Sequence, residues 1–131
     1  MGVIDEQELL NQWRDLLKQH ANTWCQLDKK LHTEHGISAS AFEALDRLVE
    51  KPHTKLRIQE LADEIHLSQS ALSRLVAQLE KEGLVERAMC ESDRRGIWVR
   101  LTPAGLERHA AAKPLHRSIL ASTGGPCVEI N

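Results

Sequence analysis

Hydrophobic residues recur along the first quarter of the chain with the three- and four-residue spacing of an α-helix. The pattern predicts one long amphipathic helix from about Asp5 to His32. Its stripe consists of Leu9, Trp13, Leu16, His20, Trp24, Leu27 and Leu31. The rest of the domain is too small to cover a stripe of this length, so we expect a partner subunit to pack against it.

A shorter amphipathic segment follows and predicts a helix that begins at about Ser38 or Ser40 and ends near Glu50. Ser40 and Glu43 have the spacing of a capping box, which would satisfy free backbone N–H groups at its start. The apolar positions expected in the core are Phe42, Leu45, Leu48 and Val49. Residues 51–55 then form a loop.

Residues 58–82 predict two helices joined by a tight turn. The small side chain of Ala62 suits two helices that cross steeply. His66 falls at the turn, where a positive φ is common and histidine is tolerated. Ser68 is a good N-cap for the second helix, and Gly83 ends it. The apolar face of the pair consists of Leu61, Ala62, Ile65, Leu67, Leu72 and Leu75.

Two β-strands are expected next, at Leu84–Met89 and Ile97–Leu101, because apolar and polar residues alternate there. Ile97, Val99 and Leu101 would face inward, with Trp98 and Arg100 outward. The sequence CESDRRG between them suits an exposed wing, and Leu56–Ile58 is the candidate third strand. An ordinary helical hairpin is the alternative for residues 58–82, and the β-hairpin that follows makes this alternative less favoured. The order predicts a mainly α fold with a small β-wing, a winged helix-turn-helix.

Three stretches resemble the MarR family of bacterial transcription regulators: ELADEIHLSQSALSRLVAQLEKEGLVER, the wing DRRG and the junction VRLTPAG. The similarity of order and spacing extends from about Trp13 to about Leu120. It implies that Ser68–Glu82 is the recognition helix and that Asp93 orients Arg95 in the wing. It also implies a homodimer that binds a pseudo-palindromic operator, usually as a repressor, and a ligand or oxidant that weakens DNA binding.

The chemistry of the expected recognition face agrees with these roles. Arg74 can bind guanine bidentately and Gln69 can bind adenine, while serine contacts bases or phosphates. Arg94 and Arg95 suit a narrow minor groove of negative potential. The candidate DNA-binding residues are Ser68, Gln69, Ser70, Ser73, Arg74, Asp93, Arg94 and Arg95. The alternatives are a solvated Arg74 paired with a nearby Glu and a solvated charge run at the wing.

The C-terminal part begins with a helix capped by Thr102, with Pro103 in its first position. Pro114 should break or kink this helix near Lys113. The helix would stop soon after Leu120, which is short for the family's final dimerisation helix. We therefore divide the chain into an N-terminal dimerisation helix (1–35), a winged helix-turn-helix (36–102), a C-terminal dimerisation region (103–121) and a tail (122–131).

The 131 residues carry a formal net charge of −2, so this is one modest domain that is not uniformly basic. The charge is uneven, because residues 94–117 are basic and the first half is more acidic. Such a distribution would steer DNA to one face. No apolar run is long enough to span a membrane and no signal sequence is evident, so the expected location is the cytoplasm. The three cysteines have no paired spacing, which disfavours a disulfide scaffold.

In proteins similar to this chain, small aromatic or phenolic effectors bind between the first helix, the DNA-binding lobe and the helix after the wing. The candidate effector-binding residues are Trp13, Arg14, His20, Trp24, His32 and His35. For the tryptophans, packing in a dimer core is the favoured alternative. A zinc site at His32, Glu34 and His35 is disfavoured against solvated histidines, so no metal or other cofactor is expected.

A thiol-based redox switch is an alternative mode of control. Cys25 lies near His20, Lys29 and Lys30 on the predicted long helix, and Cys90 lies at the base of the wing. A sensing thiol needs exposure and a lowered pKa. Neither cysteine has the position near the start of the first helix that peroxide-sensing relatives use.

Three classes of function remain to be compared. A dimeric repressor released by a small molecule fits all the motifs above. A winged-helix protein-interaction module would need an acidic or apolar recognition face, and the expected face is neither. An enzyme is disfavoured because the sequence has no Ser-His-Asp or Cys-His arrangement, no phosphate-binding Gly loop and no convincing metal site.

Overall fold

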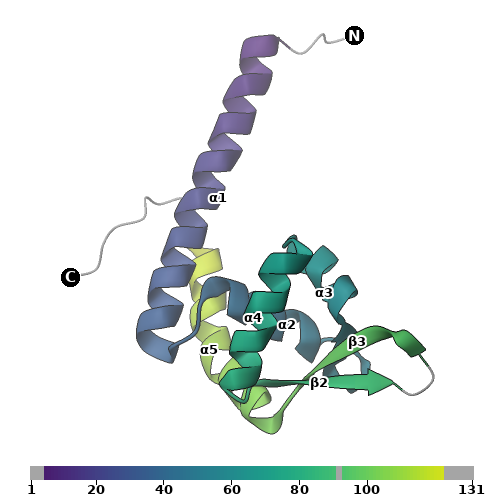
Figure 1. Ribbon diagram of the computed structural model, residues 1–131. Helices are drawn as coiled ribbons and strands as arrows, with labels where there is room; N and C mark the ends of the chain where they lie inside the picture. Colours follow the sequence, from purple (N-terminus) through teal and green to yellow (C-terminus); the bar gives the residue numbers. More distant parts are fainter. Residues whose placement is uncertain (1–4, 91–92, 123–131) are drawn as a thin grey trace.

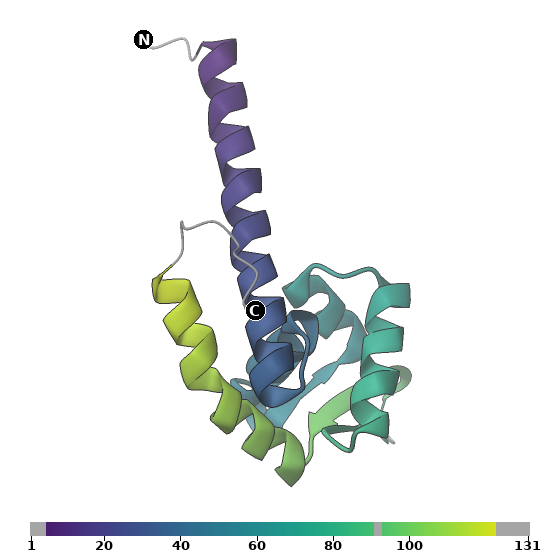
Figure 2. The same cartoon turned by 90° about the vertical axis from the view of Figure 1, so that its left-hand side faces the viewer.

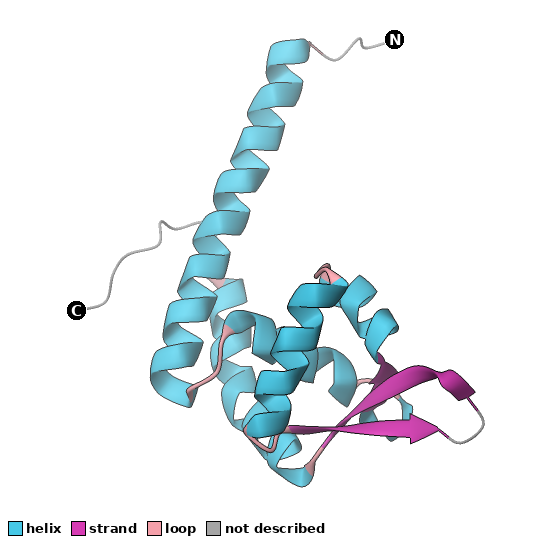
Figure 3. Ribbon diagram, viewed as in Figure 1, coloured by secondary structure: helices cyan, strands magenta, loops and turns pink. Residues whose placement is uncertain are grey.

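The computed structural model describes residues 5–90 and 93–122, apart from the side chains of Cys90 and of residues 93–95. Figure 3 shows mostly helices beside one small sheet, which confirms the predicted fold class. The elements are α1 (Glu6–His35), α2 (Ala39–Val49), a 3₁₀ turn (Pro52–Thr54), β1 (Lys55–Arg57), α3 (Ile58–Ile65), α4 (Gln69–Lys81), β2 (Val85–Cys90), β3 (Asp93–Leu101) and α5 (Pro103–Ala121).

Helix α1 projects well beyond the body of the molecule, and only its C-terminal part reaches the core (Figure 1). Leu27 and Leu31 are its buried residues. The helix ends at His35, three residues later than predicted, and is capped by Gly36, whose left-handed φ of 63° allows its N–H to reach the carbonyls of the last turn. The N-terminal part of α1 therefore leaves its apolar stripe without a covering element among the described residues.

Helix α2 lies at the centre of the core, with Phe42, Leu45 and Leu48 fully buried. Its N-cap is Ser38, whose Oγ accepts from the Ala41 N–H at 3.1 Å. The predicted capping box at Ser40 is therefore wrong. Ser38 is preferred because its backbone is extended, as an N-cap requires.

The three strands form an antiparallel sheet in the order β1-β3-β2, with Leu56 paired to Val99 and Arg87 to Val99 on the other side. Strand β1 begins and ends one residue before the predicted Leu56–Ile58, because Ile58 already starts α3. The segment 51–55, expected as a loop, contains the 3₁₀ turn.

Strand β3 is longer than predicted, because it begins at Asp93 instead of Ile97. The segment expected as a wing loop therefore contributes four residues to a strand. Val99 and Leu101 are buried as expected, but Ile97 is 38% exposed. The expectation that Ile97 faces a core is wrong because Ile97 lies outside the core together with its strand partner Met89, which is 72% exposed.

Helix α5 begins as predicted, with the Thr102 Oγ1 accepting from the Gly105 N–H at 3.0 Å and Pro103 in the first turn. Of the two outcomes expected near Lys113, a break or a kink, the break does not occur, because the helix continues through Pro114 to Ala121. Figure 2 shows its axis bending between its two halves, which agrees with the kink. Pro114 and Ala110 are both exposed, so the carbonyl that Pro114 leaves without its helical donor can be hydrated.

Candidate DNA-binding site and adjacent pocket

The turn between α3 and α4 has the geometry of a helix-turn-helix. His66 adopts the left-handed conformation, with φ 59° and ψ 38°, and its N–H bonds to the Ala62 carbonyl. Leu67 donates to the same carbonyl at 3.1 Å. Ser68 then caps α4 by accepting from the Ala71 N–H at 3.1 Å. The cap and turn predicted from sequence are confirmed.

Helix α4 has one buried and one exposed face. Leu72, Val76 and Leu79 are buried in the core. The five polar residues predicted to contact DNA are all exposed at or near the start of this helix: Ser68, Gln69, Ser70, Ser73 and Arg74. Within residues 5–90 and 93–122, Arg74 makes no ion pair or hydrogen bond, so no Glu in this part of the chain neutralises it. The N-terminal half of α4 therefore presents free hydrogen-bonding groups to solvent.

The wing is formed by β2 and β3 (Figure 1). The backbones of Asp93, Arg94 and Arg95 belong to β3, whereas their side chains lie outside the described part of the structure. The role of Asp93 in orienting Arg95 stays a prediction.

The base of the wing carries cations that the sequence reading missed. Lys55 Nζ lies 4.8 Å from the ring centre of Trp98, and the guanidinium carbon of Arg57 lies 5.4 Å from it. The Arg57 side chain passes Gly96 so closely that a Cβ there would be 3.4 Å from it. These residues come from β1 and β3, and only the register of the sheet shows that they are neighbours.

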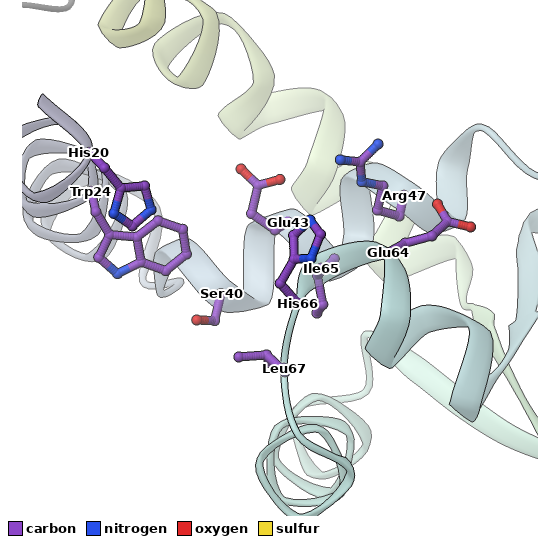
Figure 4. Close-up of a pocket in the computed structure, with 9 residues that line it drawn as sticks. All are labelled: His20, Trp24, Ser40, Glu43, Arg47, Glu64, Ile65, His66 and Leu67. Atoms are coloured by element: carbon purple, nitrogen blue, oxygen red, sulfur yellow. The ribbon is translucent and has the colours of Figure 1, made fainter. Parts of the chain in front are cut away.

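A pocket of about 350 Å³ lies between α1, α2 and the helix-turn-helix turn. It is lined by His20, Trp24, Ser40, Glu43, Arg47, Glu64, Ile65, His66 and Leu67. Figure 4 shows the stacked His20 and Trp24 on one side of it and His66 with Glu43 on the other. An aromatic wall facing polar groups suits a small aromatic molecule that carries a hydrogen-bonding substituent.

The structure separates the predicted effector-binding residues. His20 and Trp24 line this pocket. Trp13 and Arg14 are exposed nearer the N-terminus of α1. His35 lines a different, more polar hollow together with Arg108. The remaining pocket residues come from α2, α3 and the turn, and their sequence positions gave no signal because three separate segments meet there.

Two carboxylates of the pocket are held by neighbours. Glu43 Oε1 is 3.1 Å from His116 Nε2, and Glu64 Oε2 is 2.9 Å from Lys51 Nζ. Arg117 Nη1 lies 2.7 Å from His116 Nδ1. Because guanidinium only donates, Nδ1 accepts this bond and the imidazole proton is on Nε2, directed at Glu43. Glu43 is thus a fixed, hydrogen-bonded part of the wall.

Further along the same helices, Asp46 receives hydrogen bonds from His109 at 2.7 Å and from Arg117 at 3.0 Å. Burial raises the pKa of Asp46, but the hydrogen bonds and positive charges of Arg117 and His109 outweigh it and hold the pKa below 3.8. The carboxylate stays ionised and joins α5 to α2.

Other candidate chemistry from the sequence is not assembled into a site. Within residues 5–90 and 93–122, no group of three or more His, Cys, Asp or Glu residues is placed to hold a metal ion, including His32, Glu34 and His35. Cys25 is in a disulfide bond, which its spacing in the sequence did not indicate. No helix in the described ranges has the length and apolar character needed to cross a membrane.

Helix, turn, helix and β-hairpin in this order define a winged helix-turn-helix protein of the kind that binds DNA. The MarR family profile matches residues 35–96. The chain is 32% identical to AbsC, a MarR family transcriptional regulator from Streptomyces coelicolor, with a TM-score of 0.80 over 92% of this chain and 80% of that one. The chain belongs to the MarR family, whose members are transcription regulators and not enzymes.

Two further relatives agree. Sco3205, a MarR family regulator from Streptomyces coelicolor solved in complex with DNA, is 32% identical with a TM-score of 0.81, over 92% of this chain and 74% of that one. The uncharacterized HTH-type transcriptional regulator YwhA of Bacillus subtilis is 29% identical over 89 residues, 68% of this chain. The match spans 62% of YwhA. The chain therefore shares its fold and family with DNA-binding transcription regulators.

Proposed function

We propose that this protein is a homodimeric repressor that binds a pseudo-palindromic operator and is released from it by a small aromatic molecule. The observation that carries the proposal is the exposed polar face of α4, whose Arg74 and Gln69 have no partner within the described residues. Such side chains at the N-terminal turns of a recognition helix reach base edges in the major groove. Sco3205, a relative at 32% identity, was solved in complex with DNA, which supports DNA binding by this chain.

The dimer is supported by the projecting part of α1. Leu9, Trp13, Leu16 and Leu17 are 46–59% exposed there, although all four are large and apolar. A contiguous apolar stripe on a projecting helix is typical of a subunit interface. A second copy of the chain would cover it, and a two-fold axis would place two recognition helices on two half-sites.

Release by an effector is supported by the pocket between α1, α2 and the turn. A molecule bound there touches the dimerisation helix and the first residues of the DNA-binding unit together. If the molecule binds more tightly to one arrangement of α1 and the DNA-binding unit than to another, it shifts the population toward the arrangement that it prefers. The stacked His20 and Trp24 favour an aromatic occupant.

The proposal is tested by fluorescence anisotropy of the full-length protein on its own upstream intergenic DNA and on scrambled DNA of equal length, at two salt concentrations. We expect saturable binding that prefers the native DNA, with one dimer per site. The salt-dependent part should be a larger fraction of the binding free energy on scrambled DNA than on native DNA, because non-specific binding is almost entirely electrostatic. Equal affinity for both DNAs, or none, would contradict the proposal and favour a protein partner for the winged helix.

A further inference from the structure

His66 belongs to two parts of the molecule at once. Its backbone forms the turn between α3 and α4, in a left-handed conformation that glycine adopts most easily because it has no Cβ. Its imidazole forms a wall of the pocket, across from His20 and Trp24 of α1 (Figure 4). A side chain kept where its backbone is disfavoured points to a role for that side chain.

The imidazole of His66 and the side chain of Arg47 are polar groups of the pocket wall for which the described residues supply no hydrogen bond. Glu43 is held by His116 and Glu64 by Lys51. Within the two described ranges of the chain, no hydrogen bond or ion pair holds the His66 ring. An occupant of the pocket can therefore displace this ring without breaking a polar contact.

The backbone of His66 is coupled directly to the start of the recognition helix. Its N–H and that of Leu67 share the Ala62 carbonyl as acceptor, and Ser68, the N-cap of α4, follows at once. The side chain and the cap are separated by a single residue, so displacement of the turn changes where the N-terminal turn of α4 lies.

We propose that His66 is the positioning residue through which a small aromatic molecule in the pocket acts on the recognition helix. The inference rests on the proposed function and names the residue that regulates it. An occupant stacked against Trp24 presses on the imidazole and moves the turn. The first two turns of α4, which carry Gln69, Ser70 and Arg74, then leave the position that fits the base edges. Glycine at this position would keep the left-handed turn and remove the imidazole that the occupant contacts.

The test uses pocket filling in place of an unidentified effector, in the full-length protein. Ser40 lines the pocket between Trp24 and Leu67, so Ser40→Phe places a ring in the cavity (Figure 4). Ser40→Ala is the matched control, which removes the hydroxyl without filling, and Ser40→Met is a smaller filler should Phe unfold the protein. Each is made alone and together with His66→Gly, which suits the left-handed turn.

We expect Ser40→Phe to weaken operator binding about tenfold and His66→Gly alone to change it less than about twofold, while the double variant loses less than about threefold. Hydrogen exchange of the amides of residues 67–72 gives a readout without DNA. It should accelerate in Ser40→Phe and return toward the parent rate in the double variant.

The outcomes separate this inference from the proposed function. Failure of the parent protein to prefer operator DNA overturns the proposed function, and hydrogen exchange still decides the coupling. Equal losses from Ser40→Phe in both backgrounds, or no loss with either filler, overturn the role of His66. A large loss of affinity from His66→Gly alone, with a smaller salt dependence, would make His66 a phosphate contact and also overturn it.

Discussion

The Nε2 atom of His109 on α5 lies 2.7 Å from the Oδ1 atom of Asp46 on α2, in a contact that is almost fully buried. The same carboxylate accepts two hydrogen bonds from Arg117. His109 and His116 both pack on the ring of Phe42, with ring centres 5.2 and 4.4 Å away. The long terminal helix is thus attached to the DNA-binding unit by a polar cluster as well as by apolar packing.

Replacing Asp46 by Ala should destabilise the protein by about 2 kcal/mol, because it leaves the buried His109 and the partly exposed Arg117 without their acceptor. Urea unfolding monitored by circular dichroism measures this change. The control is Glu86→Gln, which breaks the pair with Arg100 on the open face of the sheet, where both side chains are nearly half exposed. That change should cost less than about 0.5 kcal/mol. Equal costs for the two variants would contradict the assignment of Asp46.

The acid stability of the protein should depend on the same carboxylate. The pKa of Asp46 lies below 3.8 in the folded state and at 3.8 in the unfolded one. Between these values the unfolded chain binds more protons, so the stability contributed by Asp46 is present above pH 3.8 and is lost as pH falls through the folded pKa. Urea midpoints measured from about pH 5 to about pH 2.5 should fall less steeply in Asp46→Asn than in the parent. Parallel curves would rule out this linkage.

Gly105→Ala should be among the most damaging single changes in the chain. A Cβ at this position would collide with the backbone carbonyl oxygen of Leu84 and lie 3.1 Å from Cδ2 of Leu101. The first turn of α5 would have to move away from the sheet, which we expect to cost about 3 kcal/mol in urea unfolding. Gly83→Ala is the comparison: its φ of 76° is strained for alanine but its surroundings are open, so about 1 kcal/mol is expected. A larger loss at Gly83 than at Gly105 would refute the steric argument.

The helix-turn-helix could be predicted from sequence because its signals are local. Ser68 caps α4 with its own side chain, His66 and Gly83 act through their own backbone conformation, and the apolar positions of α4 repeat at helical spacing. Two details of the helices could not be predicted, because they depend on the backbone conformation and the solvent exposure of the folded chain. Ser38 caps α2 instead of Ser40, and α5 continues through Pro114 because the exposed side of the helix tolerates the missing hydrogen bond.

The pocket and the polar cluster could be predicted only in part, because they join segments that are distant in the chain. Glu43 and His116 are 73 positions apart, and the sequence gives no sign that they meet. His20 and Trp24 were predicted because they face the same way on one helix. His66 was noted only for its backbone, since periodicity shows which residues share a face but not which faces meet.

The exposed apolar stripe of α1 should hold the dimer together. Trp13 and Leu16 are 55% and 59% exposed in the single chain, so Trp13→Glu with Leu16→Glu should remove apolar burial and place like charges opposite each other. We expect the parent to have the mass of two chains by light scattering and the variant that of one. Asn11→Glu is the control, since helical periodicity places Asn11 on the opposite side of α1. A variant that stays dimeric would place the interface elsewhere.

Removal of the Arg74 side chain and removal of the Arg95 side chain should change the affinity for DNA in different ways. Arg74 is exposed at the N-terminal half of α4 and makes no ion pair within the described residues. Arg74→Ala should cost about 1–3 kcal/mol on the operator and little on scrambled DNA, because a bidentate contact to guanine reads sequence. Arg95→Ala should weaken binding to both DNAs and lower the salt slope by about 1, as expected for a groove or phosphate contact. Lys18→Ala, on the polar side of α1, controls for the loss of one positive charge and should leave both affinities unchanged. If Arg74→Ala and Lys18→Ala behaved alike, α4 would not lie in the major groove with Arg74 at the bases, and the docking proposed for this protein would be wrong.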